Sequence, residues 1–390
     1  MRARLFTPGP TQIPERVQVA MSNPLMHHRG IEFKELFAEV REGLRYFFQT
    51  EGDVIALTAS GTGAMEACVV NLISNGDKVL VVSGGKFGQR WQQLCQTYGA
   101  DIHSMEVPWG EAVDPDEIKA ALQAHRDIQV VFLTHSETST GVAADVETIS
   151  RIVHQHSDAL LVVDSITSAG VLPFKMDEWG IDVAVTGSQK GLMIPPGLAV
   201  VALNARAWQR VETVTLPRYY FDLRQEKAAQ DANVTAWTPG ITLFMGLREA
   251  LRMIREKGLE KMWQTYALLA HATRQGVVAM GLELFAKSPS DSLTAVTVPD
   301  AIDGLEFVRH LRERYGITVA GGQSQLKGKI FRIAHMGYYD ALDMVAMASA
   351  LELSLRDFNW GFSQGAGVAA VQKVFMENDF SGKAIGTNKS

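Results

Sequence analysis

Apolar side chains recur along this chain with two different periods. Between residues 32 and 48 they return every three or four positions, as at Phe33, Leu36, Val40 and Leu44, which predicts an amphipathic helix. From there to about residue 200, short β-rich apolar runs alternate with helical stretches. Strands that are joined by crossover helices predict a mostly parallel sheet covered by helices on both faces.

These predicted elements can be stated as ranges. The strands are Val54–Leu57, Lys78–Val82, Val130–Leu133, Leu160–Val163, Val183–Thr186 and Leu198–Leu203. The helices between them include Ala64–Ile73, Lys86–Tyr98, Pro115–Ala124 and Val146–His156.

A second pattern, of helices and a few strands, begins near Gly240. Its predicted helices are Leu243–Lys257, Leu259–Met280, Leu305–Tyr315 and Asp340–Arg356, and its strands are Leu284–Phe285, Ser292–Val298 and Lys329–Ile333. We therefore expect an α/β protein in four parts. These are an extended N-terminal arm (1–17), a large domain (18–256), a smaller α+β domain (257–356), and a tail (357–390) with a helix at Val368–Met376 and a disordered end from residue 379.

Composition excludes several classes of protein. The 390 residues carry a net charge of −6 and show no dense basic stripe, so nucleic acid is not an expected partner. The longest strictly apolar run, Leu198–Leu203, is far shorter than the ~20 residues of a membrane span. Pro8, Gly9 and Pro10 interrupt any apolar stretch of a signal peptide.

The two cysteines, Cys68 and Cys95, are too few for a disulfide framework, a four-cysteine zinc site or a cysteinyl iron–sulfur centre within one chain. A reducing, cytoplasmic location is therefore expected. His27 and His28 are adjacent and have no third ligand nearby, so no metal site is expected there.

The segment from Ser60 to Glu66 follows a predicted strand and opens a helix. Gly61 and Gly63 would let backbone N–H groups approach a phosphate, which the helix N-terminus attracts. An ordinary tight turn that is capped by Ser60 or Thr62 is the alternative. Glu66 departs from a dinucleotide fingerprint, and no lysine follows the second glycine as in a P-loop.

Two further residues end predicted strands. Asp164 stands at the carboxyl end of a buried strand, where open α/β sheets bind ligands, although it could also cap a turn. Lys190 follows the next strand among small residues, where burial would lower its pKa and favour Schiff-base chemistry, although an ordinary solvated lysine is the alternative. The two are 190 − 164 = 26 residues apart, one strand–helix–strand unit, so both should lie at one edge of the sheet.

A phosphate-binding turn, an acid and a buried lysine at one sheet edge suit pyridoxal phosphate (PLP), whose aldehyde a lysine holds and whose ring nitrogen an acid keeps protonated. Phe87 is placed to stack on the ring, unless it is a core residue. Arg332 lies in an apolar strand, where it would hold either a substrate carboxylate or an internal acidic partner.

Six motifs in this order resemble the class V aminotransferases, in particular the alanine–glyoxylate and serine–glyoxylate (serine–pyruvate) enzymes of bacterial and cyanobacterial type. The resemblance covers about residues 4 to 356. The motifs are Thr7-Pro-Gly-Pro-Thr11, Ser60-Gly-Thr-Gly-Ala-Met-Glu66, His135-Ser-Glu-Thr-Ser-Thr-Gly141, Val163-Asp-Ser165, Gly187-Ser-Gln-Lys190 and Gly321-Gly-Gln followed by Lys327-Gly-Lys-Ile-Phe-Arg332.

The resemblance implies PLP-dependent transferase fold type I and a role for each matching residue. Lys190 would form the aldimine and Asp164 would pair with the ring nitrogen. The remaining cofactor contacts would come from Ser60, Gly61, Thr62, Phe87, Thr138, Ile166 and Gln189, and substrate contacts from Arg332 and Gly9. Thr238 would reach the phosphate of the neighbouring subunit in a homodimer, while Thr235 replaces a tyrosine of the animal enzymes.

The expected reaction is a ping-pong transfer of the amino group of alanine or serine to glyoxylate, giving glycine and pyruvate or hydroxypyruvate. Another class V PLP enzyme, such as a lyase or an aminotransferase with a different small amino donor, is an alternative. A non-catalytic accessory subunit of a redox complex is a second alternative.

Overall fold

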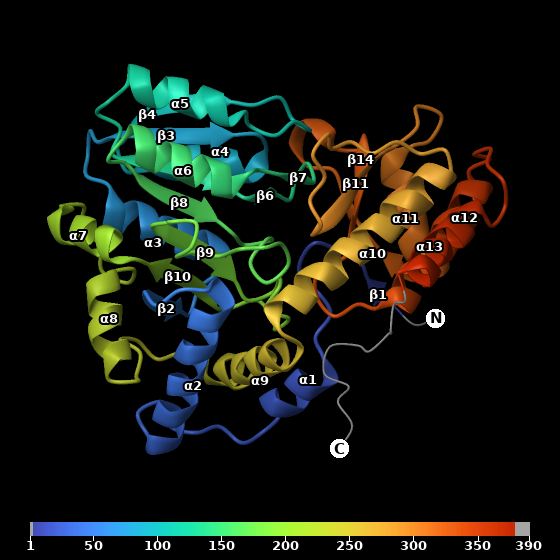
Figure 1. The fold of residues 1–390 in the computed structure, drawn as a ribbon. Coiled ribbons are helices and arrows are strands. Elements are labelled where there is room, and N and C mark those ends of the chain that lie inside the picture. Colours follow the sequence, from blue (N-terminus) through green and yellow to red (C-terminus); the bar gives the residue numbers. More distant parts are fainter. Residues whose placement is uncertain (1–2, 379–390) are drawn as a thin grey trace.

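The computed structural model describes residues 3–378, and its centre is a seven-stranded sheet (Figure 1). The strand order is β2-β10-β9-β8-β5-β3-β4, and only β10 runs antiparallel to its neighbours. The strands are β2 (Asp53–Leu57), β3 (Lys78–Ser83), β4 (Asp101–Glu106), β5 (Val130–Thr134), β8 (Leu160–Asp164), β9 (Val183–Gly187) and β10 (Ala199–Leu203).

Alternate residues of each strand enter two different hydrophobic cores, one on each face of the sheet. Val131 and Leu133 of β5 pack on one side, and Val130 and Phe132 pack on the other. The first core includes α2 (Ile31–Phe48), α5 (Pro115–Ala124), α6 (Val146–His156) and α9 (Ile241–Lys257). The second includes α3 (Gly61–Leu72), α4 (Lys86–Thr97), α7 (Ala205–Thr213) and the start of α8 (Leu223–Asp231). Each fully buried aliphatic side chain stabilises this sandwich by about 1.5–3 kcal/mol.

A smaller antiparallel sheet lies beside the first (Figure 1). Its strands, in the order β11-β14-β13, are β11 (Leu293–Thr297), β14 (Ile330–Ala334) and β13 (Ala320–Gly321). The helices around it are α10 (Leu259–Ala279), α11 (Gly304–Tyr315), α12 (Ala341–Asp357) and α13 (Ala366–Glu377). The N-terminal β1 (Arg4–Leu5) pairs with β12 (Ile317–Thr318), so the start of the chain is tied to this second region.

The remaining short elements are α1 (Glu15–Met21), β6 (Ser136–Glu137), β7 (Val142–Ala143) and a 3₁₀ turn at Ser324–Leu326. Within residues 3–378, no helix is both long enough and apolar enough to cross a membrane.

The expected α/β class with a mostly parallel sheet and a smaller α+β part is confirmed, but some elements differ from the prediction. Leu284–Phe285 is not a strand, because Leu284 makes a single isolated bridge to Val296. The edge strand β4 was not predicted, since its residues are partly exposed and mostly polar. The short helices α1, α7 and α8 were not predicted either. The expected disorder from residue 379 onward lies outside the described residues.

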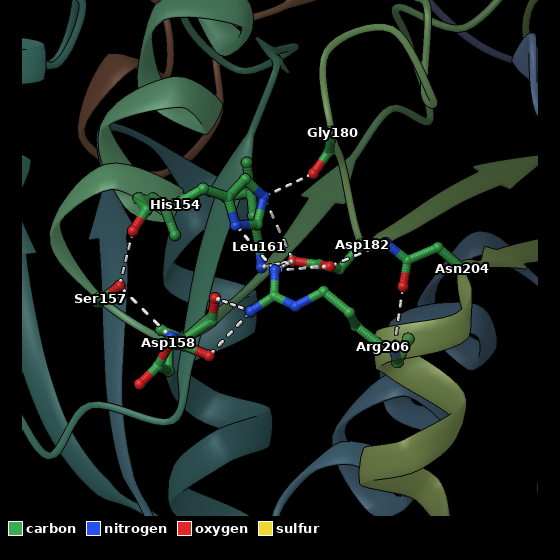
Figure 2. A network of polar contacts seen from close by, with 11 residues as sticks. His154, Ser157, Asp158, Leu161, Gly180, Asp182, Asn204 and Arg206 are labelled. Carbon is green, nitrogen blue, oxygen red and sulfur yellow. Dashed lines mark hydrogen bonds and ion pairs between the residues drawn. The ribbon is translucent and has the colours of Figure 1, made fainter.

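A polar network closes the amino end of β9, away from the ends where the predicted site residues lie (Figure 2). Asp182 is fully buried and accepts hydrogen bonds from Leu161 N–H (2.8 Å), Asn204 Nδ2 (2.9 Å) and Arg206 Nη1 (3.1 Å). His154 Nε2 lies 2.6 Å from the Gly180 carbonyl oxygen. These hydrogen bonds fix the position of the segment that enters β9. The other end of β9 leads to Lys190.

Candidate active site

Asp164 and Lys190 lie at the same edge of the large sheet, as their spacing predicted. Asp164 is the last residue of β8 and stands opposite Thr134 of β5 and Val185 of β9. Lys190 follows the end of β9 by three residues. The carboxyl ends of neighbouring parallel strands therefore bring an acid and an amine to one place.

The Asp164 carboxyl group has one protein donor. Its Oδ1 accepts a hydrogen bond from Ile166 N–H at 2.8 Å, and no other group within residues 3–378 donates to the side chain. Burial, with a smaller contribution from the Glu137 charge, raises the pKa of Asp164 to about 7, although the hydrogen bond from Ile166 N–H and the charges of Arg90 and Lys190 act to lower it. A cationic N–H donor at the free oxygen would favour the charged form.

The Lys190 amine contacts the N-terminal segment. Its Nζ donates a hydrogen bond to the Pro8 carbonyl oxygen at 2.5 Å. A Cβ at Gly9, whose φ is +145°, would lie 2.3 Å from this Nζ, so only glycine fits there. Burial lowers the pKa of Lys190 to about 8, and the charges of Arg332 and Arg90 also lower it while Asp164 raises it. A neutral, nucleophilic amine is therefore accessible near physiological pH.

Helix α3 begins in the predicted phosphate-binding turn. Ser60 is its N-cap residue but makes no side-chain capping bond, contrary to the turn-capping alternative. No acceptor within the described residues takes the N–H groups of Gly61 and Thr62. A Cβ on Gly61 would lie 2.7 Å from Ile166 Cδ1, so the helix start and the segment after Asp164 are in close contact. This end of α3 offers free donors to an anion.

Two polar side chains near this turn differ in their partners. Gln189 Oε1 is buried and has no hydrogen-bond partner, although buried amide oxygens normally have one. Thr62 Oγ1 accepts a hydrogen bond from Arg90 Nη1 at 3.2 Å.

Phe87 lies at the start of α4 and is only half-buried. It belongs to neither hydrophobic core, so the core alternative for this ring is not what the structure shows. Its backbone N–H donates to Glu137 Oε2 at 3.0 Å, and Gly88 N–H donates to the same oxygen at 3.0 Å. The Glu137 carboxylate thus holds the N-terminus of the helix that presents Phe87.

Arg332, on β14, has no acidic partner in the described part of the chain. Its Nη1 donates to the Thr138 carbonyl oxygen and its Nη2 donates to the Gly321 carbonyl oxygen, each at 2.7 Å. Burial lowers the pKa of Arg332 to about 10, while Glu137 acts in the opposite direction. A buried guanidinium that is held only by carbonyl groups is suited to an incoming carboxylate.

The remaining predicted residues have varied surroundings. Thr138 is buried, and its Oγ1 lies 2.9 Å from Thr167 Oγ1. Ile166 is buried at the end of the sheet. Thr238 is exposed, whereas the Thr235 hydroxyl donates to the Trp237 carbonyl oxygen at 2.6 Å. The structure therefore brings together Asp164, Lys190, Gly61 and Ile166, and leaves Thr238 on the surface of this chain.

Sequence reasoning missed Glu137 and Arg90. Both lie inside segments that were singled out for other residues, but their contacts run between segments distant in the sequence. The three-residue spacing from Phe87 to Arg90 on one helix was an available indication that the two side chains share a face.

Comparison with known proteins now identifies the family. Residues 4–339 match the family described as Aminotransferase class-V. The chain belongs to this family. It is 38% identical over 389 residues to a serine–glyoxylate aminotransferase of Methylorubrum extorquens, with 97% of each chain covered. It is also 42% identical over 378 residues to a protein of Synechococcus sp. (strain PCC 6716) named soluble hydrogenase, small subunit, with 96% of this chain and 98% of that protein covered.

The solved structure of an alanine–glyoxylate aminotransferase from Nostoc sp. superimposes with a TM-score of 0.87 at 34% identity. The match covers 91% of this chain and 96% of that one. The expected fold type is therefore confirmed, and the class V aminotransferase uses PLP as its cofactor.

The donor set of the site fits PLP. The N–H groups at the start of α3 are free in the predicted phosphate turn, Asp164 has a free carboxyl oxygen, and Lys190 has a lowered pKa. The N–H groups of α3 would meet the phosphate, Asp164 would meet the protonated ring nitrogen, and the Lys190 amine would meet the aldehyde.

Proposed function

We propose that this class V aminotransferase moves the amino group of alanine, serine or both to glyoxylate, giving glycine and pyruvate or hydroxypyruvate. The observation that carries the proposal is the pairing of a buried acid and a buried amine at one sheet edge with Arg332, which has no acidic partner among residues 3–378. The identity to a serine–glyoxylate aminotransferase and the likeness to an alanine–glyoxylate aminotransferase support these donors.

We assign the cofactor contacts as the resemblance implied. Gly61, Thr62, Ser60 and Gln189 would hold the phosphate, and Thr138 would lie near the ring hydroxyl. Phe87 and Ile166 would cover the two ring faces. When bound, PLP supplies an electron-withdrawing ring that stabilises negative charge on the substrate Cα.

The protein side chains perform the remaining steps. Asp164 holds a proton at the ring nitrogen through its free oxygen. Arg332 binds the substrate carboxylate, with the Gly9 backbone beside it, and so fixes which bond to Cα faces the lysine. The Lys190 amine takes the proton from the substrate Cα as general base and later returns it as general acid, for which a pKa near 8 is suited.

The proposal extends to the architecture and location. Residues 18–256 would form the PLP-binding domain and residues 257–356 the smaller domain. Two chains would pair as a homodimer in which Thr238 of each contributes to the other's phosphate site. Because Cys68 and Cys95 are free and buried, the reducing cytoplasm is the compartment that we propose.

A donor–acceptor panel tests the reaction. Purified enzyme is offered alanine, serine, aspartate and other small amino acids with glyoxylate or pyruvate, and products are quantified. We expect glycine formation from alanine or serine, and its loss in Lys190→Ala. Arg332→Gln should raise the KM of both substrates, since a charged hydrogen bond contributes about 1.5–3 kcal/mol. Activity only with other donors would contradict the glyoxylate proposal while leaving the aminotransferase intact.

A redox accessory role is the second candidate, because a relative is named as a hydrogenase subunit. It predicts dye reduction under hydrogen when the protein is combined with a hydrogenase partner. Hydrogen-dependent activity that persists in Lys190→Ala would favour this candidate over transamination.

A further inference from the structure

Arg90 is a cation without an acidic partner beside the proposed phosphate turn. It lies on α4 one turn after Phe87, and its guanidinium carbon is 4.8 Å from the centre of the Phe87 ring. Its Nη1 donates to Thr62 Oγ1 at 3.2 Å. No Asp or Glu within residues 3–378 forms an ion pair with it. Arg90 is partly buried, and a cation at such a position attracts an anion more strongly than a fully solvated cation does.

The proposed phosphate turn lacks a charge of its own. The residues from Ser60 to Gly63 include no Lys or Arg, and the helix N-terminus offers only partial positive charge. The nearby Lys190 amine is assigned to the reaction. A doubly negative phosphate at this turn therefore needs a cation from another element, and Arg90 reaches the turn from α4.

We propose that Arg90 is the cationic member of the phosphate-binding site. It holds Thr62 in place and supplies the positive charge that selects the phosphorylated cofactor. Arg90 thus contacts both Phe87, on which the cofactor ring would stack, and the turn that would hold the phosphate. The inference rests on the proposed placement of the phosphate at the start of α3.

A purely structural role for Arg90 would have a different consequence. If Arg90 only supported the Phe87 ring, its loss would weaken binding of the cofactor with or without its phosphate. If it acts on the phosphate, its loss should weaken binding of PLP but spare pyridoxal, which has the same ring and aldehyde and lacks the phosphate.

The experiment measures the Kd of PLP and of pyridoxal for the cofactor-free protein by quenching of tryptophan fluorescence. In Arg90→Gln we expect about a 10- to 100-fold weaker PLP affinity, the scale of one charged hydrogen bond, and unchanged pyridoxal affinity. Arg90→Lys should recover part of the PLP affinity. In wild type, inorganic phosphate should compete with pyridoxal phosphate for the site.

Arg126→Gln is the matched control, because Arg126 is exposed and precedes β5, at the opposite end of the strand from the site. It should change neither Kd. Equal losses for PLP and pyridoxal in Arg90→Gln, or no loss at all, would overturn the inference. If that variant does not fold, Arg90→Met, which also removes the charge, takes its place, and an unchanged PLP-to-pyridoxal affinity ratio in Arg90→Met overturns the inference. Failure of wild type to bind PLP would instead refute the proposed function.

Discussion

Lys190 combines burial near two arginines with a direct hydrogen-bond acceptor for its amine. Burial lowers the pKa of Lys190 from 10.5 to about 8, and the Pro8 carbonyl oxygen holds Nζ in the site. A neutral amine can form a bond to an aldehyde, whereas a protonated one cannot. The lowered pKa therefore sets the pH range in which the cofactor-free protein reacts with PLP.

We expect the rate of PLP capture to increase with pH up to about 8 and then to level off. The direction follows because deprotonation of Lys190 on raising the pH produces the reactive form. Stopped-flow absorbance after mixing cofactor-free protein with PLP measures the rate. Nα-acetyl-lysine is the control, and its reaction should continue to accelerate toward its ordinary pKa. A protein rate that rises in parallel with this control would contradict the lowered pKa.

At the residue scale, the sequence predicted the placement of groups that terminate buried strands. Asp164 and Lys190 could be placed because each stands at or just after the end of an apolar run. The end of such a run marks the carboxyl end of a buried strand. Glu137 and Arg90 could not be placed, because their contacts join segments that only the folded chain brings together. Nothing in the local pattern distinguishes such a carboxylate from one exposed to solvent.

At the scale of elements, α4 depends on a carboxylate from another segment. Glu137 accepts hydrogen bonds from Phe87 N–H, Gly88 N–H, Ser139 N–H and, at 2.5 Å, Ser139 Oγ. Burial raises the pKa of Glu137, although these donors act to lower it. The N-terminus of α4, with Phe87 and Arg90 on its first turns, is therefore held by Glu137 together with Ser139, whose Oγ accepts a hydrogen bond from Lys86 N–H at 2.9 Å.

Glu137→Gln should destabilise the protein, because the amide NH₂ would face N–H donors that lose their acceptor. Each buried donor that is left unpaired costs about 1–3 kcal/mol. Denaturant unfolding measures the free energy, and the fluorescence titration with pyridoxal should show weaker binding as the Phe87 ring loses its fixed position. Glu35→Gln, on the exposed face of α2, is the control and should leave both unchanged. Unaltered stability and pyridoxal affinity in Glu137→Gln would contradict this role.

The edge strand β4 was not predicted, for a physical reason. A pattern of buried runs identifies interior strands, but β4 is an edge strand whose partly exposed residues show little apolar periodicity.

The direction of β10 follows from the segment that connects it to β9. The 188–198 segment contains Pro195, Pro196 and Gly197 and forms no crossover helix, so the chain returns antiparallel.

At the scale of the whole molecule, the proposed site draws on both sheets and on the N-terminal segment. Asp164 and Lys190 come from the large sheet, Arg332 comes from the small sheet, and Pro8 lies in the segment that β1 anchors to the second region. Thr238 is the exception, since it lies exposed on the surface of the same chain. A homodimer in which Thr238 reaches the neighbouring site would complete the arrangement.

Complementation between two inactive variants tests this division. In a mixed dimer of Lys190→Ala and Thr238→Glu, one site combines both defects, while the other has an intact lysine and an intact partner threonine. Random pairing should therefore restore about a quarter of wild-type activity, although each variant alone is inactive because it lacks the lysine or repels the phosphate. Glycine formation after co-expression measures the recovery.

Lys190→Ala mixed with Asp164→Ala is the control, because both residues serve the site of their own chain and every mixed site stays defective. If the first pair recovers no more activity than the second, Thr238 does not act across the dimer.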